Sequence, residues 1–265
     1  MLFRREFKRN LRGLIIWSII IAGIIFLYLG IFPSMAKQQQ DMDNLMNAVP
    51  EGMQKAFGMD RLSLGTLLGF YGIEIHLMTT LLGSIYAALL ASGIVAKEQN
   101  EKTAEFLLAL PVSRPTIIVH KWLAAMANVL LFNAVIVAAS FAGFQLAHGE
   151  DLSYKAFFLL ELAVLMMHLT FAGIAFLFSA VARRTRSIVS MSLGTVFIMY
   201  FLSVAAGLSD RLSWLKYVTP FKYADSAQII TERSFHPLYA GIMAIAIAGC
   251  FLASYWYYNK KDIAV

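Results

Sequence analysis

The sequence is poor in charged residues and contains a single cysteine. Charged residues make up 14% of the chain, whereas soluble domains carry about 25%. This shortage argues against a soluble globular protein. Cys250 has no second cysteine to pair with, which excludes an intrachain disulfide and a cysteine-based metal cluster.

Nucleotide-binding and zinc-protease motifs are also missing. There is no G-x-x-x-x-G-K-[ST] run, so the chain has no phosphate-binding Walker A loop of its own. There is no H-E-x-x-H run, and the five histidines are scattered over different segments. We therefore predict that the chain is not an enzyme and that it binds neither a cofactor nor a metal ion.

Long apolar runs are what the sequence has in abundance, with 59% hydrophobic residues. Runs of about 18 residues or more are long enough to cross about 30 Å of hydrocarbon. The first run is too long for a signal peptide and no clear A-x-A cleavage site follows it. The predicted fold class is an all-α integral membrane protein, in which residues 1–265 form a single transmembrane domain. Its six transmembrane helices are expected at 14–32, 76–96, 122–147, 158–182, 187–208 and 238–258.

The basic residues predict the orientation of these helices. Loops on one side hold 14 of the 22 basic residues, and these loops are 1–13, 97–121, 183–186 and 259–265. The positive-inside rule places that side in the cytoplasm, so both termini are expected there and the protein is expected in the plasma membrane. The net charge of +6 then fits anionic membrane lipid. No soluble basic module is present, so we expect no nucleic-acid partner.

The first thirteen residues predict a basic amphipathic helix. Apolar side chains recur at helical spacing, and basic side chains fill the positions between them; the two sets are Leu2, Phe3, Phe7, Leu11 and Leu14, and Arg4, Arg5, Lys8, Arg9 and Arg12. Such a helix is suited to lie along the inner membrane surface. Two interpretations stay open: a plain topology anchor, and an interfacial helix that also touches a cytoplasmic partner.

Two larger segments are predicted on the outer side. Residues 33–75 are Met-rich and mildly acidic, and glycines interrupt their last apolar stretch, so a short helix is expected near the outer interface. Residues 209–237 combine aromatic residues, which favour the membrane–water interface, with Pro220 and Pro237. A pair of short re-entrant or interfacial helices is expected there.

Few polar residues fall inside the predicted spans. Glu161 is expected near the outer interface, where a charge costs little. Asn128 and Asn133 in the third span and His168 in the fourth lie deeper. Asn133 and His168 are about 16 Å and about 21 Å above their cytoplasmic helix ends, so adjacent helices would bring them within reach. Two interpretations of Asn128, Asn133 and His168 stay open: interhelical hydrogen bonding, and the polar lining of a substrate path.

The cytoplasmic loop 97–121 is the most informative segment. Asn100 is a good helix N-cap, Glu101 complements the helix dipole, and Pro111 limits the helix end. Leucines and a phenylalanine at 106–110 supply an apolar face. A short amphipathic helix there would press one face on the bundle and offer the other to a soluble protein. A solvated loop accounts for the pattern equally well.

This loop resembles that of the permease subunits of ABC-2-type ATP-binding-cassette exporters. Those proteins carry a glutamate after the second span, then a T-x-E-x-L-L-x-x-P-x-S-R run, and a lysine at the third span. The matching residues here are Glu98, Thr103, Glu105, Leu107, Leu108, Pro111, Ser113, Arg114 and Lys121. Lys102 stands where the family often has glycine. A basic start, an outer Pro220-Phe221 pair and the ending at 260–263 extend the likeness over most of the chain.

The resemblance implies a division of labour. Two permease chains, identical or related, pair in the membrane, and each docks a separate ATPase chain that binds ATP and Mg²⁺ and drives alternating access. The loop then acts as a cytoplasmic coupling helix, whose expected ATPase-coupling residues are Glu98, Glu101, Lys102, Thr103, Glu105, Leu107, Leu108, Pro111, Ser113, Arg114 and Lys121. The alternative is a membrane scaffold or sensor that recruits a cytoplasmic partner. An intramembrane enzyme is disfavoured, because no paired catalytic constellation is present.

Overall fold

The computed structural model describes residues 2–38, 48–96, 113–147, 152–182 and 185–260. Within these ranges every regular element is helical. Six helices are long and apolar enough to cross a membrane, which confirms the predicted all-α membrane architecture. They are α1 (Leu2–Ala36), the run from Leu67 to Ile94 that ends in α5 (His76–Ile94), α8 (Arg114–Ala147), α9 (Tyr154–Val181), α10 (Thr185–Leu208) and α13 (Pro237–Lys260).

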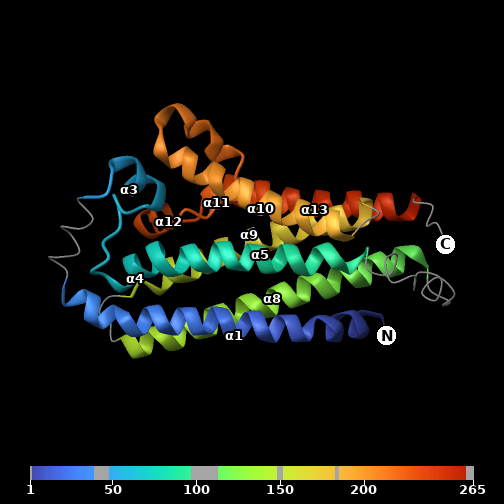
Figure 1. Cartoon of the computed structure of the whole chain (residues 1–265), viewed down its shortest axis with the longest axis horizontal. Coiled ribbons are helices and arrows are strands. Elements are labelled where there is room, and N and C mark those ends of the chain that lie inside the picture. The colour runs from blue at the N-terminus through green and yellow to red at the C-terminus, as the bar shows by residue number, and fades with distance from the viewer. Residues whose placement is uncertain (1, 39–47, 97–112, 148–151, 183–184, 261–265) are drawn as a thin grey trace.

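The long helices lie side by side in one elongated bundle (Figure 1). Helix α1 packs along α8, α5 packs against α9, and α13 covers another side of α9. The start of α1 and the finish of α13 lie at the same end of the bundle, which we call the terminal end. We call the opposite end the distal end. Six membrane-length helices, an even number, bring the chain back to the end at which it began. This agrees with the prediction that both termini lie on one side of the membrane.

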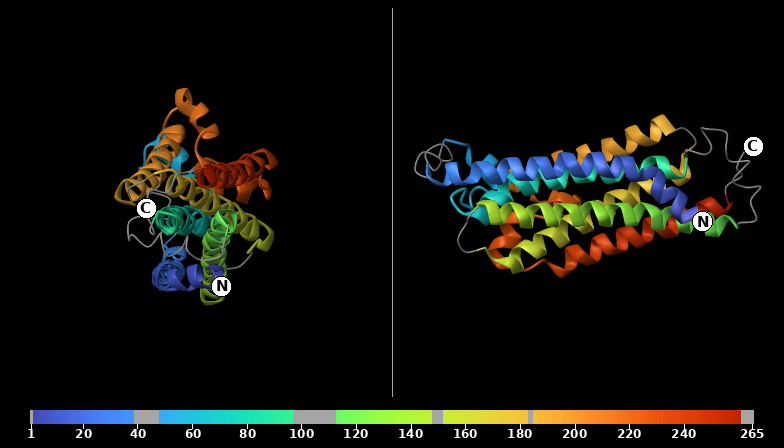
Figure 2. Two further views of the ribbon diagram at one scale, coloured as in Figure 1. Left: turned by 90° about the vertical axis from the view of Figure 1, so that its right-hand side faces the viewer. Right: turned by 90° about the horizontal axis from the view of Figure 1, so that it is seen from below.

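Helix α1 begins at Leu2, twelve residues before the predicted first span, and runs without a break to Ala36. Its first turns bend away from the axis of the rest of the helix (Figure 2). The predicted N-terminal amphipathic segment is therefore helical and continuous with the first span. Its position along the membrane surface stays a prediction.

Short helices occupy the distal end, as the sequence indicated. Before α5 lie α3 (Glu51–Phe57), α4 (Leu67–Phe70) and a π-helical turn, η1 (Tyr71–Ile75). Between α10 and α13 lie the 3₁₀ helix η2 (Asp210–Tyr217), α11 (Pro220–Tyr223) and α12 (Ser226–Glu232). The segment at 209–237 thus contains three short helices instead of the predicted pair.

Side-chain caps fix where several of these helices begin. The side chains of Thr66, Ser153 and Asp225 accept hydrogen bonds from the backbone N–H groups of Gly69, Ala156 and Gln228. Such N-caps satisfy donors that the first turn of a helix leaves unpaired. Helix α3 ends at Gly58, whose φ of 72° is a left-handed conformation that glycine adopts without strain.

Candidate functional site

The predicted coupling loop follows α5 in the sequence and precedes α8, and the last turn of α5 and the first turn of α8 both lie at the terminal end of the bundle (Figure 1). Glu98, Glu101, Lys102, Thr103, Glu105, Leu107, Leu108 and Pro111 lie outside the described residues, so their role stays a prediction. Ser113 is exposed, and its carbonyl accepts the N–H of Ile117 as α8 begins. Its hydroxyl lies 2.8 Å from that of Thr116. Arg114 is the first residue of α8.

Lys121 is fully buried in the second turn of α8. Its Nζ donates a hydrogen bond to the carbonyl oxygen of Ile94 at 2.5 Å. Ile94 is the last residue of α5, so the ammonium group caps a carbonyl that a helix end leaves unpaired and complements the negative end of the helix dipole. Lys121, to which the family resemblance assigned a coupling role, thus links α8 to α5 by a hydrogen bond.

Glu6 of α1 is the counter-ion of this buried lysine. Its Oε1 lies 3.7 Å from Lys121 Nζ, and its Oε2 lies 2.7 Å from the guanidinium of Arg9. Only 1% of Glu6 is exposed, so the pair is shielded from water far better than a surface ion pair would be. The sequence carried one signal of this contact: Glu6 is the sole acidic residue among the basic residues of 2–13.

Helix α9 also holds the residues that follow α5. The hydroxyl oxygen of Ser179 accepts hydrogen bonds from the backbone N–H groups of Val95 and Ala96, both at 3.1 Å. These are the last described residues before the loop. Four helices therefore meet where the chain enters the predicted coupling loop. We call Glu6, Ile94, Lys121 and Ser179 the loop anchor.

The deep polar residues of the predicted spans are all buried, but only two of the three meet. His168 Nδ1 lies 3.0 Å from Asn133 Oδ1, and its Nε2 donates to the carbonyl oxygen of Thr79 at 3.1 Å. Asn128 instead donates to the carbonyl of Ala124, one turn earlier in its own helix. The structure thus contains the interhelical contact that the sequence anticipated and extends it to α5. A role in a substrate path stays a prediction.

Glu161, which the sequence predicts near the outer interface, is buried within the bundle. It is 5% exposed, and its Oε1 accepts a hydrogen bond of 2.5 Å from the hydroxyl of Tyr71. The Tyr71 hydroxyl also lies 2.9 Å from that of Ser140. Glu161 is therefore buried between α8, α9 and η1. Neither Tyr71 nor Ser140 was singled out from the sequence, because each contact joins segments at least 69 positions apart.

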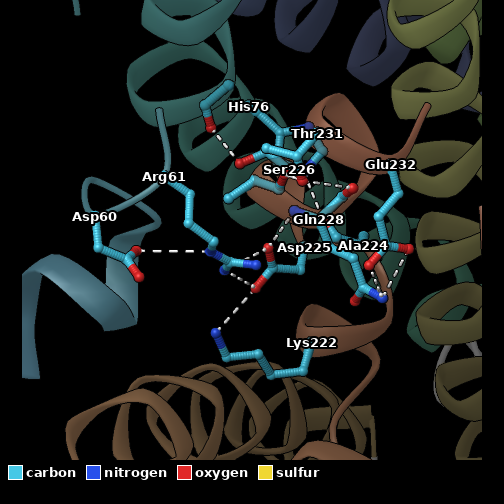
Figure 3. A network of polar contacts seen from close by, with 12 residues as sticks. Asp60, Arg61, His76, Lys222, Ala224, Asp225, Ser226, Gln228, Thr231 and Glu232 are labelled. Atoms are coloured by element: carbon cyan, nitrogen blue, oxygen red, sulfur yellow. Dashed lines mark hydrogen bonds and ion pairs between the residues drawn. The ribbon is translucent and has the colours of Figure 1, made fainter. Parts of the chain in front are cut away.

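A polar network fastens the short distal helices to one another (Figure 3). Arg61 donates to Asp225 Oδ1 at 3.2 Å, and Lys222 Nζ lies 3.1 Å from Asp225 Oδ2. Ser226 donates to the carbonyl of Gly72 at 2.7 Å, and a ring nitrogen of His76 lies 2.7 Å from the carbonyl oxygen of Ala224. The network joins residues before α4, at the start of α5 and around α12.

Asp225 is the central charge of this network. Burial alone raises the pKa of its carboxyl group, but Lys222, Arg61 and the N–H of Gln228 more than offset burial, so the pKa lies below its ordinary value. The carboxylate form is thereby stabilised at neutral pH. A pocket of about 70 Å³ lies against the network and is lined partly by His76, Tyr200 and Asp225.

Comparison with known proteins assigns the chain to a family. The family described as ABC-2 family transporter protein matches residues 1–263. The chain belongs to this ABC-2 transporter family. The resemblance predicted from the loop motif is therefore confirmed at the level of the family, which is one of membrane transporter proteins.

One curated relative of the ABC-2 permease is the uncharacterized protein YhcI of Bacillus subtilis strain 168, which is 27% identical over 217 residues. The alignment covers 70% of this chain and 66% of the relative, so the chain spans just under two thirds of the relative's length.

Among the described residues, no group of three or more His, Cys, Asp or Glu side chains is placed to hold a metal ion.

Proposed function

We propose that this chain is the permease subunit of an ABC exporter, which pairs with a second permease chain and with two separate ATPase chains. The ATPase chains bind ATP and Mg²⁺, and their closure switches the permease pair between inward- and outward-facing states. The observation that carries the proposal is the family match along residues 1–263, in a bundle with six membrane-length helices. Both termini lie in the cytoplasm, so the terminal end faces the ATPases.

The loop anchor supports a mechanical role for the segment between α5 and α8. A docked ATPase that moves this loop pulls on the end of α5. Lys121 and Ser179 attach that end to α8 and α9 by direct hydrogen bonds. A displacement of the loop therefore moves α5, α8 and α9 together, because hydrogen bonds link the three helices at this end.

The distal network supports alternating access at the other end. Arg61 and Asp225 lie 164 positions apart in the sequence and bridge the segment before α4 to the start of α12. In this structure the bridge is formed. Opening the permease toward the outside separates these short helices, so we propose that the bridge breaks in the outward-facing state.

Coexpression with the cognate ATPase tests the proposal. Native mass spectrometry of the purified complex should give two permease chains and two ATPase chains. Glu98→Ala, Glu105→Ala and Arg114→Ala together should abolish ATPase copurification or uncouple ATP hydrolysis from transport. A contact desolvated across a protein interface loses about 2–5 kcal/mol when one partner is truncated, whereas a solvated pair loses about 0.2–1 kcal/mol.

Glu51→Ala is the matched control, because Glu51 is an exposed carboxylate at the distal end. It should leave the complex intact. A triple loop variant that copurifies with its ATPase and transports like the wild type would reduce the loop to a simple connector. A permease chain that transports without any ATPase would overturn the exporter mechanism.

A further inference from the structure

The first turns of α1 carry a basic face that has no acidic partner in the described part of the chain. Arg4, Arg5, Lys8 and Arg12 are all exposed, and none forms an ion pair with another described residue. Arg4, Lys8 and Arg12 follow one another at four-residue spacing, so they share one side of the helix, and Arg5 lies next to that row. Four positive charges are therefore concentrated on one surface.

The one acidic residue of this segment faces the opposite way. Glu6 is buried, where it contacts Arg9 and Lys121. The helix thus turns its negative charge toward the protein and its positive charges outward. A bare positive face is suited to a partner with dense negative charge.

Two aromatic side chains beside the basic row indicate what kind of partner this face binds. Phe3 is 37% exposed and stacks on Phe7 with ring centroids 5.9 Å apart. At helical spacing both rings lie along one side of the basic row. A helix with basic residues next to exposed phenyl rings binds at the headgroup level of a bilayer, with its rings toward the acyl chains. The bend of these first turns away from the axis of α1 fits this placement (Figure 2).

The same segment is joined to the loop anchor. Glu6 lies on α1, its partner Lys121 lies on α8, and Lys121 caps the last carbonyl of α5. Lys121 Nζ lies 3.7 Å from Glu6 Oε1 and 2.5 Å from the carbonyl oxygen of Ile94, so one ammonium group joins the two. Any shift of the first turns of α1 therefore reaches the end of α5 through one buried ammonium group.

We propose that the first turns of α1 bind acidic phospholipid headgroups through Arg4, Arg5, Lys8 and Arg12, and that Glu6 transmits this binding to the end of α5 through Lys121. The proposal deepens the proposed function, since it makes the lipid a regulator of the segment that couples to the ATPase. Its two deciding measurements, lipid retention and hydrogen exchange, use the permease chain alone, so their failure stays distinct from a failure of the proposed transport function.

The first test measures lipid binding. The full chain is placed in nanodiscs of phosphatidylcholine mixed with phosphatidylglycerol, and the retained acidic lipid is counted by native mass spectrometry. Each basic side chain near an anionic surface adds about a fivefold gain in affinity. The variant Arg4→Gln, Arg5→Gln, Lys8→Gln, Arg12→Gln should therefore lose most of its retained phosphatidylglycerol, and wild-type retention should fall as salt rises.

The matched control neutralises four exposed basic residues of the distal end and is the variant Lys55→Gln, Lys155→Gln, Arg211→Gln, Lys216→Gln. It removes the same charge and should retain phosphatidylglycerol as the wild type does. Equal loss in both variants would show a response to net charge alone and would overturn the lipid site. Wild-type lipid retention by the α1 variant, combined with loss of ATPase copurification, would assign the basic face to the ATPase.

The second test follows hydrogen exchange of the backbone amides of Val95 and Ala96, which Ser179 holds. Phosphatidylglycerol should slow this exchange severalfold in the wild type. Glu6→Gln should keep the lipid and lose the slowing, since it removes the charge that faces Lys121. Glu6→Asp, which shortens the side chain, should behave in the same way. Slowing that persists in both variants would refute transmission through Glu6.

Discussion

Gly83 is the position where one added methyl group should most disturb the bundle. A Cβ atom there would lie 2.2 Å from His168 Cε1 and 2.3 Å from His168 Nε2. The imidazole cannot swing away cheaply, because Asn133 and Thr79 hold its two nitrogens and the side chain is fully buried. Gly83→Ala should therefore separate α5 from α9 or eject the ring from its site.

The size of the effect follows from two contributions. Hydrogen bonds between membrane helices are worth about 0.6 kcal/mol each on average, so losing both costs about 1 kcal/mol. Overpacking a well-packed core adds about 1–3 kcal/mol. The total of about 2–4 kcal/mol should lower the Tm of the purified chain in detergent by roughly 5–15 °C for a protein of this size.

Gly93→Ala is the matched control, because it lies in the same helix and an added Cβ there meets nothing within 4 Å. The variant should leave Tm unchanged within a degree or two. In a His168→Ala background, Gly83→Ala should cost little, because the clashing ring is gone and contacting residues are strongly coupled. The same Tm for Gly83→Ala and Gly93→Ala, measured by fluorescence-detected thermal unfolding, would refute the packing argument.

Two further predictions concern the ends of the bundle. A cysteine added at the C-terminus in a Cys250→Ala background should resist an impermeant thiol reagent in intact cells; labelling without lysis would contradict the proposed topology. At the distal end, Asp225 has a lowered pKa in the folded protein, so its contribution to stability is complete above its ordinary pKa and is lost as pH falls through the lowered value. Thermal unfolding between pH 7 and pH 3 should therefore show a smaller acid loss of Tm for Asp225→Asn than for the wild type, and parallel curves would contradict this.

The membrane helices were predictable from the sequence because apolar length alone specifies them. All six expected spans coincide with observed helices, although α1 and α8 extend well beyond the predicted bounds. The extensions follow from polar residues that continue a helix outside the apolar window. A prediction from hydropathy detects only the apolar segment of a helix. The backbone hydrogen bonds of the helix continue into the polar residues on either side of that segment.

The contacts inside the bundle were predictable only in part. Asn133 and His168 were paired correctly, since their depths in adjacent helices matched. The loop anchor was missed, although Lys121 itself was identified through the family motif. Its partners Glu6 and Ile94 lie on two other helices, and helix rotation decides which side chains meet. Neither periodicity nor composition specifies that rotation when helices are apolar on every side.

Docking of an ATPase at the terminal end is the claim on which the functional account depends, and site-specific cross-linking tests it most directly. A photo-cross-linking residue placed at Ser113, exposed at the start of α8 beside the predicted loop, should capture the cognate ATPase in cells. The same residue placed at Lys155, exposed near the start of α9 at the distal end, should capture none. Capture from position 155, or from neither position, would contradict the account.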